Sequence, residues 1–257
     1  MKTVLPLDDA AADLATVGGK GASLARLARA GLPVPGGFHI TTGAYRAFVS
    51  AFGEEIAHAE EARGLFAEHD MPAEIAAEIR RAYEALGDDV AVAVRSSATA
   101  EDLPDMSFAG QQDTFLNVRG EALLDAVKRC WASLWNPRAI AYREQNGVPH
   151  DGVALAVVVQ ELVEAESAGV MFTADPVTGN RDEIVVNASW GLGEAVVGGQ
   201  VTPDTVVVSG GAVVRSQVGD KTVMTVRTPD GTREEPVPEE LRGRPVLEGA
   251  RAVELAA

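Results

Sequence analysis

Short apolar runs separated by glycine and proline predict a chain of mixed α and β structure, with helices concentrated in its first third. Leu24, Leu27 and Ala28 share one face of a helix that emerges from a loop at Gly18, and Gly31 is placed to end this helix. We then expect, in order, a short strand at 38–41, a helix capped by Thr42, a helix at 55–67, and a helix at 72–86 capped by Asp70.

The rest of the chain is dominated by strand patterns. The Val and Ala run at 90–94 predicts a buried strand that delivers the polar residues Arg95, Ser96 and Ser97 at its end. A small, polar segment separates it from an alternating strand at 114–118, after which we expect a helix around Cys130 and a short helix opened by Pro137. Further strands are expected at 153–161, 168–172, 183–188, 205–208, 212–215 and 222–226, with a flexible glycine-rich crossing at 191–199.

These patterns indicate an α/β (α+β) fold with one principal portion at residues 1–235. It is mainly helical over about 1–90 and sheet-rich over 90–235. Pro236 and Pro238 indicate a linker, so we expect 236–257 to hold that linker and the start of a helix that is cut short, since no capping residue or glycine ends it.

The charge balance narrows the function. The 257 residues include 22 Lys and Arg against 38 Asp and Glu, a net charge of −16, which disfavours binding to nucleic acid or anionic lipid. An acidic protein that binds a phosphorylated ligand must therefore gather its cations locally. No apolar run approaches the length of a membrane span, and the single cysteine, Cys130, fits a buried small residue in a reducing compartment, so we expect a cytoplasmic protein.

Gly18-Gly19-Lys20-Gly21 is the first candidate site. Glycines allow the backbone to approach an anion, the following helix presents N–H groups, and Lys20 adds a full charge. The segment lacks the spacing of a P-loop, so the local pattern alone also fits an ordinary solvated helix start.

Two strand ends are further candidates. Arg95 is either solvated at a strand tip or held against an anion, for which its planar guanidinium is suited. Gln160 and Glu161 end the most apolar strand, where a nucleobase finds apolar walls and amide groups, although many buried strands end this way without binding anything. A Mg²⁺ ion could be bound by the carboxylates of Asp175, Asp182 and Glu183, although in so acidic a chain these residues also fit an ordinary solvated surface. We assign no role to the four histidines.

Taken together, five segments resemble the ATP-grasp domain of the phosphoenolpyruvate-utilising dikinases, which include pyruvate, water dikinase (phosphoenolpyruvate synthase), pyruvate, phosphate dikinase and rifampicin phosphotransferase. They occur in the family's order, and as a set they are highly specific. The matching segments are Val17-Gly-Gly-Lys-Gly-Ala-Ser-Leu24, Val94-Arg-Ser-Ser-Ala-Thr-Ala-Glu-Asp102, Ser107-Phe-Ala-Gly-Gln-Gln-Asp-Thr-Phe115, Val170-Met-Phe-Thr-Ala-Asp-Pro-Val-Thr-Gly179 and Ala188-Ser-Trp-Gly-Leu-Gly-Glu194.

The resemblance implies an ATP-grasp-like fold and a site for ATP with Mg²⁺. It makes Lys20 and Arg95 ligands of the triphosphate, and Gly110 and Thr114 parts of a loop that closes over the phosphates. It implies that the wall beside the adenine is formed by Gln160 and its neighbours Glu161, Leu162 and Val163.

The chain also departs from the family pattern. The later glutamate that holds Mg²⁺, the Gln-x-Arg-Pro strand and the Thr-Ser-His loop with its carrier histidine are not found, so we assign no catalytic residue or metal ligand here. The resemblance therefore implies the front portion of a phosphotransferase that is catalytically incomplete alone. Its partners would be a phosphohistidine domain and an acceptor-binding domain.

Two functional hypotheses remain open at this stage. The first is an ATP-binding portion that passes the β-phosphoryl group of ATP to a carrier histidine, and from there to pyruvate or to an antibiotic such as rifampicin. The second is a freestanding, non-catalytic nucleotide-binding module that acts with a separate histidine-bearing chain. Residues 172–180 and 187–194 are slightly closer to the rifampicin phosphotransferases.

Overall fold

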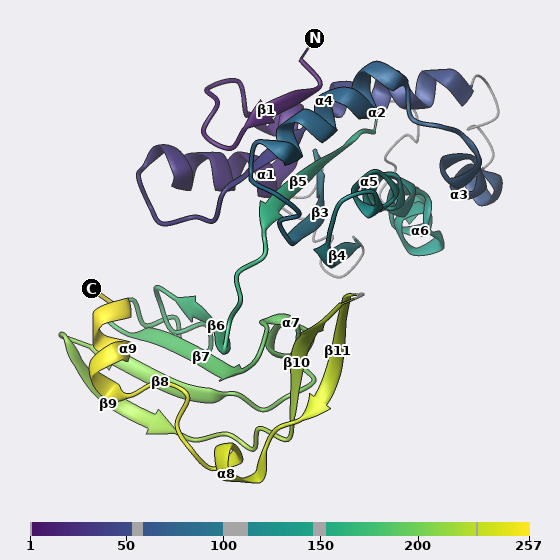
Figure 1. Ribbon diagram of the computed structural model, residues 1–257. Coiled ribbons are helices and arrows are strands. Elements are labelled where there is room, and N and C mark those ends of the chain that lie inside the picture. The colour runs from purple at the N-terminus through teal and green to yellow at the C-terminus, as the bar shows by residue number, and fades with distance from the viewer. Residues whose placement is uncertain (1, 53–58, 100–112, 146–152, 230) are drawn as a thin grey trace. The chain divides into compact units, whose positions relative to one another are not determined.

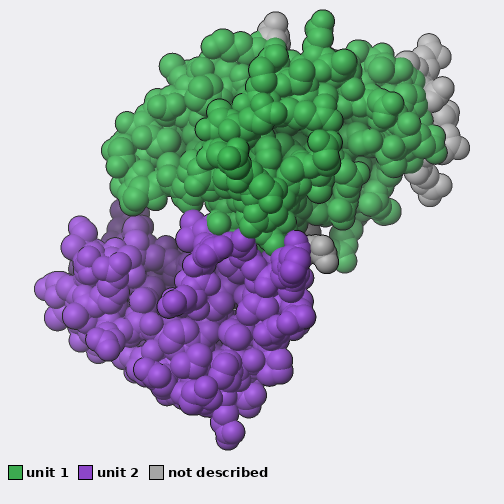
Figure 2. Space-filling model, in the orientation of Figure 1, with its two compact units in different colours: residues 1–162 green, residues 163–257 purple. Residues whose placement is uncertain are grey.

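The computed structural model of the protein describes residues 2–52, 59–99, 113–145, 153–229 and 231–257. It divides into two compact units, Met1–Leu162 and Val163–Ala257, which Figure 2 shows in different colours. The division falls inside the range 1–235 that the sequence pattern suggested as one portion.

A five-stranded antiparallel sheet organises the first unit (Figure 1). Its strands occur in the spatial order β1-β2-β5-β3-β4, so β5, which comes last in sequence, lies at the centre. The apolar run of β5 is buried along most of its length, as expected for a central strand covered on both faces. The strands are β1 (Val4–Pro6), β2 (Gly37–Ile40), β3 (Val92–Ala98), β4 (Thr114–Val118) and β5 (Leu155–Glu161).

Helices cover both faces of this sheet. α1 packs on β3 and β5 from one side, and α5 packs on β3, β4 and β5 from the other. The main core lies on the α5 side, where Val94 and Val159 of the sheet meet Phe48, Phe66 and Trp131. The helical elements of the unit are α1 (Leu14–Arg29), α2 (Thr42–Val49), α3 (Ala59–Glu68), α4 (Ala73–Glu84), α5 (Ala122–Ala132), the 3-10 turn Ser133–Trp135, and α6 (Pro137–Gln145).

The structure confirms the expectation that Cys130 is a buried residue of the core. It is fully buried in α5, and burial raises the pKa of its thiol, so the side chain behaves as a small apolar residue. Among the described residues, no helix is long and apolar enough to cross a membrane.

Three local expectations need correction. α2 is capped by Thr41, whose side chain accepts from the N–H of Ala44, and Thr42 is already helical. α4 begins after Pro72 without a side-chain cap, so Asp70 does not cap it. β3 does not end at Arg95 but continues to Ala98, because residues 96–98 remain paired with residues 155–157 of β5.

The second unit contains a four-stranded antiparallel sheet of order β6-β7-β8-β9 and a two-stranded ribbon of β10 and β11. The glycine-rich crossing expected at 191–199 contains a short helix, α7, and β11 lies just before the expected linker, in a segment where the pattern showed no strand. The elements are β6 (Ser167–Phe172), β7 (Ile184–Trp190), α7 (Glu194–Val197), β8 (Asp204–Ser209), β9 (Ala212–Gln217), β10 (Val223–Thr228), β11 (Gly231–Pro236), α8 (Glu239–Arg242) and α9 (Gly249–Leu255).

The last helix belongs to the core of the second unit. Ala252 of α9 is fully buried and packs with Val206 and Val208 of β8. An ion pair between Asp204 and Lys221, both almost inaccessible to solvent, lies in the same unit. Residues 236–257 therefore contribute packing to the unit, and the N–H of Val246 donates to the carboxylate of Asp204.

Candidate functional site

One row of residues crosses the whole sheet of the first unit on a single face. Leu5 of β1 lies opposite His39 of β2, and His39 lies opposite Val158 of β5. Val158 in turn lies opposite Arg95, which lies opposite Thr114 of β4. Directly paired residues of antiparallel strands project from the same face. The fold therefore places the predicted ligands Arg95 and Thr114 side by side, although the sequence separates them.

Ser97 identifies this face as the one that α1 covers. Its hydroxyl donates to the carbonyl oxygen of Val17 at 2.7 Å and accepts from the N–H of Gly21 at 3.1 Å. Because side chains two positions apart on a strand share a face, Arg95 projects to the side of α1 as well. Lys20 precedes Gly21 directly, so the turn of α1 that carries Lys20 lies over the face that carries Arg95.

The glycine segment that carries Lys20 differs from the expected loop. α1 begins at Leu14 under a cap from Asp13, whose side chain accepts from the N–H of Thr16. The helix is then interrupted at Gly18, with φ of 71° and ψ of 177°, and continues to Arg29. Gly31 has a positive φ of 75°, in agreement with the predicted helix end. Lys20 thus lies in the first turn after a kink.

The predicted adenine wall is only partly assembled within the first unit. Gln160 lies opposite Ala93, two residues from Arg95, and so shares the α1 face, where its side-chain amide donates to the carbonyl oxygen of Pro35 at 3.1 Å. Glu161 points to the other face and lies against Gly36. Val163 begins the second unit and is largely exposed, and Gly110 lies outside the described residues.

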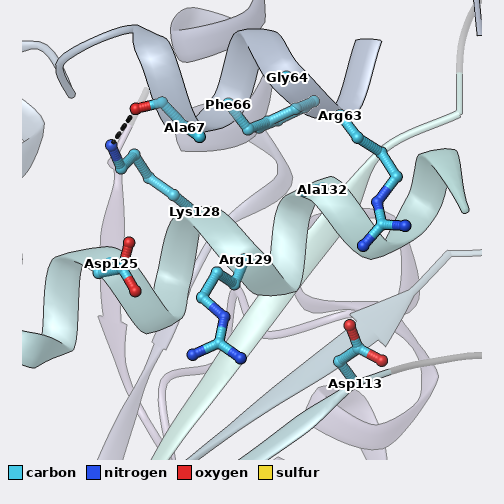
Figure 3. A pocket seen from close by; sticks show the side chains of 9 residues that line it. All are labelled: Arg63, Gly64, Phe66, Ala67, Asp113, Asp125, Lys128, Arg129 and Ala132. Carbon is cyan, nitrogen blue, oxygen red and sulfur yellow. Dashed lines mark hydrogen bonds between the residues drawn. The ribbon is translucent and has the colours of Figure 1, made fainter. Parts of the chain in front are cut away.

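A pocket of about 460 Å³ lies between α3 and α5. Figure 3 shows its lining, in which Lys128 donates to the carbonyl oxygen of Ala67. The guanidinium of Arg129 stacks on Phe115, which pairs with Val94 and therefore projects to the α5 side. This pocket thus lies on the opposite face of the sheet from Lys20, Arg95 and Thr114.

Of the three acidic residues considered as Mg²⁺ ligands, Asp175 has a structural role in the second unit. Asp175 is buried, and its carboxylate accepts from the N–H groups of Val177 and Thr178. The hydrogen bond from Val177 is the main reason that its pKa is lowered. Among the described residues, no group of three or more histidine, cysteine or acidic side chains is arranged to hold a metal ion.

His39, for which the sequence pattern indicates no role, lies beneath α1. It is fully buried, its Nε2 lies 3.2 Å from the carbonyl oxygen of Leu7, and its Nδ1 has no hydrogen-bond partner among the described residues. A Cβ atom at Gly21 would lie 3.3 Å from this Nδ1. A single histidine within a short apolar strand was the only sequence signal available for it.

We expect acid to destabilise the first unit through His39. Burial lowers its pKa from 6.5, outweighing the contact with Leu7 and the charge of Asp9, which act in the opposite direction. As the pH falls through 6.5, the imidazole of His39 takes up a proton more readily in the unfolded chain than in the folded chain. The contribution of His39 to the free energy of unfolding is therefore constant above this pH and falls below it. Urea denaturation between pH 5 and about 7.5 should show this slope. The slope should shrink in His39→Gln and persist in His69→Gln.

The first unit is thus a mixed α/β structure, in which a kinked, glycine-containing helix lies on one face of an antiparallel sheet and places the turn of Lys20 over the face of Arg95. Residues 14–257 match the family described as "Pyruvate phosphate dikinase, AMP/ATP-binding domain". The chain belongs to this family.

Curated relatives agree with this assignment. A "Probable phosphoenolpyruvate synthase" of Methanothermobacter thermautotrophicus is 47% identical over 95% of this chain and 39% of its own length. The phosphoenolpyruvate synthase of Pyrococcus furiosus is 43% identical over 86% of the chain and 34% of its own length. A rifampicin phosphotransferase of a Streptomyces species is 45% identical over the whole chain and 32% of its own length. The chain spans between 32% and 39% of the length of these relatives, and the identities do not separate the two activities.

Proposed function

We propose that this chain binds the triphosphate of ATP on the α1 face of the five-stranded sheet, as the nucleotide-binding portion of a dikinase-type phosphotransferase. The observation that carries the proposal is the placement of Arg95 and of the turn holding Lys20 on one face. The membership of the family supports ATP as the nucleotide.

The electrostatic argument follows from the acidic composition. A chain of net charge −16 repels ATP over most of its surface, so binding requires cations concentrated at one place. Lys20 supplies a compact charge and Arg95 a planar pair of donors, which suit phosphate oxygens in different ways. Thr114 is exposed beside Arg95 and adds a hydroxyl that can donate to the same phosphates.

Mg²⁺ would accompany the nucleotide, since it neutralises charge on adjacent phosphoryl oxygens during transfer. In the reaction we propose, the β-phosphoryl group of ATP passes to a carrier histidine on another domain or chain. The final acceptor would be pyruvate or an antibiotic such as rifampicin, in line with the names of the relatives.

The site is tested by titrating the protein with ATP and Mg²⁺ and recording the chemical shifts of its backbone amides by NMR. We expect saturable shifts near Gly21 and Arg95 in the wild type. Lys20→Ala and Arg95→Ala should each weaken binding by about 1.5–3 kcal/mol, or roughly 10- to 150-fold, because each removes a charge-assisted hydrogen bond to phosphate.

Arg26→Ala is the matched control, because it removes an exposed cation from the same helix, more than one turn beyond Lys20. It should bind ATP nearly as well as the wild type. Equal affinity in Lys20→Ala, Arg95→Ala and Arg26→Ala, or no ATP-dependent shift in the wild type, would contradict the proposed site.

A further inference from the structure

Ser97 makes the polar connection between α1 and the sheet. Its side chain is completely buried, and its single hydroxyl both donates to Val17 and accepts from Gly21. These two partners flank the kink at Gly18 and the residue Lys20. One side chain on β3 therefore holds both ends of the turn that carries Lys20.

The backbone at Gly18 is shaped to admit this contact. A Cβ atom at Gly18 would lie 2.3 Å from the carbonyl oxygen of Ser97 and 2.4 Å from its hydroxyl oxygen. The positive φ of 71° also disfavours any residue with a side chain. α1 thus approaches the end of β3 as closely as a bare backbone allows, and the hydroxyl of Ser97 occupies the position that a side chain on α1 would need.

The same strand carries the other half of the predicted phosphate site. Arg95 is two residues before Ser97 on the same face, and Thr114 is its direct neighbour on β4. A strand paired on both sides is rigid, so the position of Arg95 is set by the sheet. The position of Lys20 relative to Arg95 then depends on how α1 is attached to the strand, which is the contact that Ser97 makes.

We propose that Ser97 is a positioning residue for the triphosphate site, holding the turn of Lys20 in register with Arg95. This inference rests on the proposed function, because it concerns the geometry of the same site. Ser97 does not need to touch ATP: its two hydrogen bonds fix the helix turn before the nucleotide arrives, so that binding does not have to order it.

Substitution of Ser97 in the 257-residue chain tests this role with two measurements. In Ser97→Ala we expect ATP affinity, from NMR titration with Mg²⁺, to fall about tenfold, since a tenfold change corresponds to the net value of one or two buried hydrogen bonds. We also expect the amide of Gly21 to exchange with solvent faster, because its acceptor is gone. Ser97→Cys keeps a side chain of similar size with weaker hydrogen bonding, so its ATP affinity should lie between those of the wild type and Ser97→Ala.

Ser133→Ala is the matched control. Ser133 is also buried in the first unit, and its hydroxyl donates to the carbonyl oxygen of Cys130 on the α5 side of the sheet. Its loss should change stability but not ATP affinity. If Ser97→Ala binds ATP as tightly as Ser133→Ala does, the inference is wrong, while weaker binding in Arg95→Ala would leave the proposed function intact.

The other possible results of these experiments also support or overturn the positioning role of Ser97. Should Ser97→Ala fail to fold, Ser97→Cys takes its place, with weaker binding than Ser133→Ala supporting the inference and equal binding overturning it. A wild type that shows no ATP-dependent shift, or an Arg95→Ala variant that binds like the wild type, overturns the proposed function and the positioning role together.

Discussion

Lys221→Met should reduce the free energy of unfolding of the second unit by about 3–5 kcal/mol. Lys221 is completely buried and pairs with Asp204, which is itself almost inaccessible. The substitution keeps an unbranched side chain of similar length but removes the positive charge. Asp204 is then left as a buried carboxylate without its counter-ion, which costs far more than the loss of a surface pair.

Asp204 also accepts hydrogen bonds from two backbone N–H groups. Its two oxygens accept from the N–H groups of Gly219 at 2.8 Å and Val246 at 2.7 Å, in addition to Lys221. These contacts join the start of β8 to the segment before β10 and to the chain leading into α9. Losing the lysine should therefore loosen the whole unit.

Hydrogen exchange at the amides of β8 and β9, measured against urea concentration, gives the stability of this unit. Arg251→Met is the control, because Arg251 forms an exposed pair with Glu254 on α9, and the loss of such a pair should change stability little. If both variants unfolded at the same urea concentration as the wild type, the buried pair would not stabilise the unit.

Elements with strong local signals were predicted well from the sequence. The apolar strand β5, the amphipathic helix α5 around Cys130 and the end of α1 at Gly31 all agree with the structure. In each case the information is local: a run of apolar residues, a helical repeat, or a glycine at a position that needs a positive φ.

Elements that depend on distant partners were predicted poorly. β3 continues through Ser96 and Ser97 because both residues pair with β5, which is distant in sequence. Their hydroxyls also find distant partners, the carbonyl oxygens of Asp113 and Val17. β11 alternates little and carries charged residues on a two-stranded ribbon, so its partner β10 determines it more than its own pattern does. Thr41 and Thr42 are equally good caps by residue type, and only the backbone decides between them.

The candidate site shows the same division. Lys20 and Arg95 were proposed from charge, strand ends and family resemblance, all of which are visible in sequence. Their common face follows from the register of β3 with β5 and β4, which no local pattern encodes. The contact between Ser97 and α1 was missed for this reason, since a serine after an arginine at the end of a strand resembles a turn.

Trp131→Ala should destabilise the first unit by about 3–5 kcal/mol, the usual cost of removing a large buried aromatic side chain. Trp131 has no exposed surface, and its ring packs edge-on against Tyr45 at 6.1 Å and tilted against Phe48 at 5.4 Å between centroids. The cavity would open between α5 and α2, on the side of the sheet away from Lys20. Amide exchange on β3 and β5 against urea concentration measures the loss.

Trp131→Phe separates packing from hydrogen bonding at the same position. The indole Nε1 of Trp131 is buried and has no hydrogen-bond partner among the described residues, so it contributes an unsatisfied donor to the core. Phenylalanine removes this donor and keeps an aromatic ring between Tyr45 and Phe48, so we expect less than half the loss seen in Trp131→Ala. Equal losses in the two variants would mean that the indole nitrogen stabilises the folded state. Because the substitution lies on the α5 side, a folded Trp131→Phe protein should also keep the ATP affinity of the wild type, whereas Ser97→Ala should not.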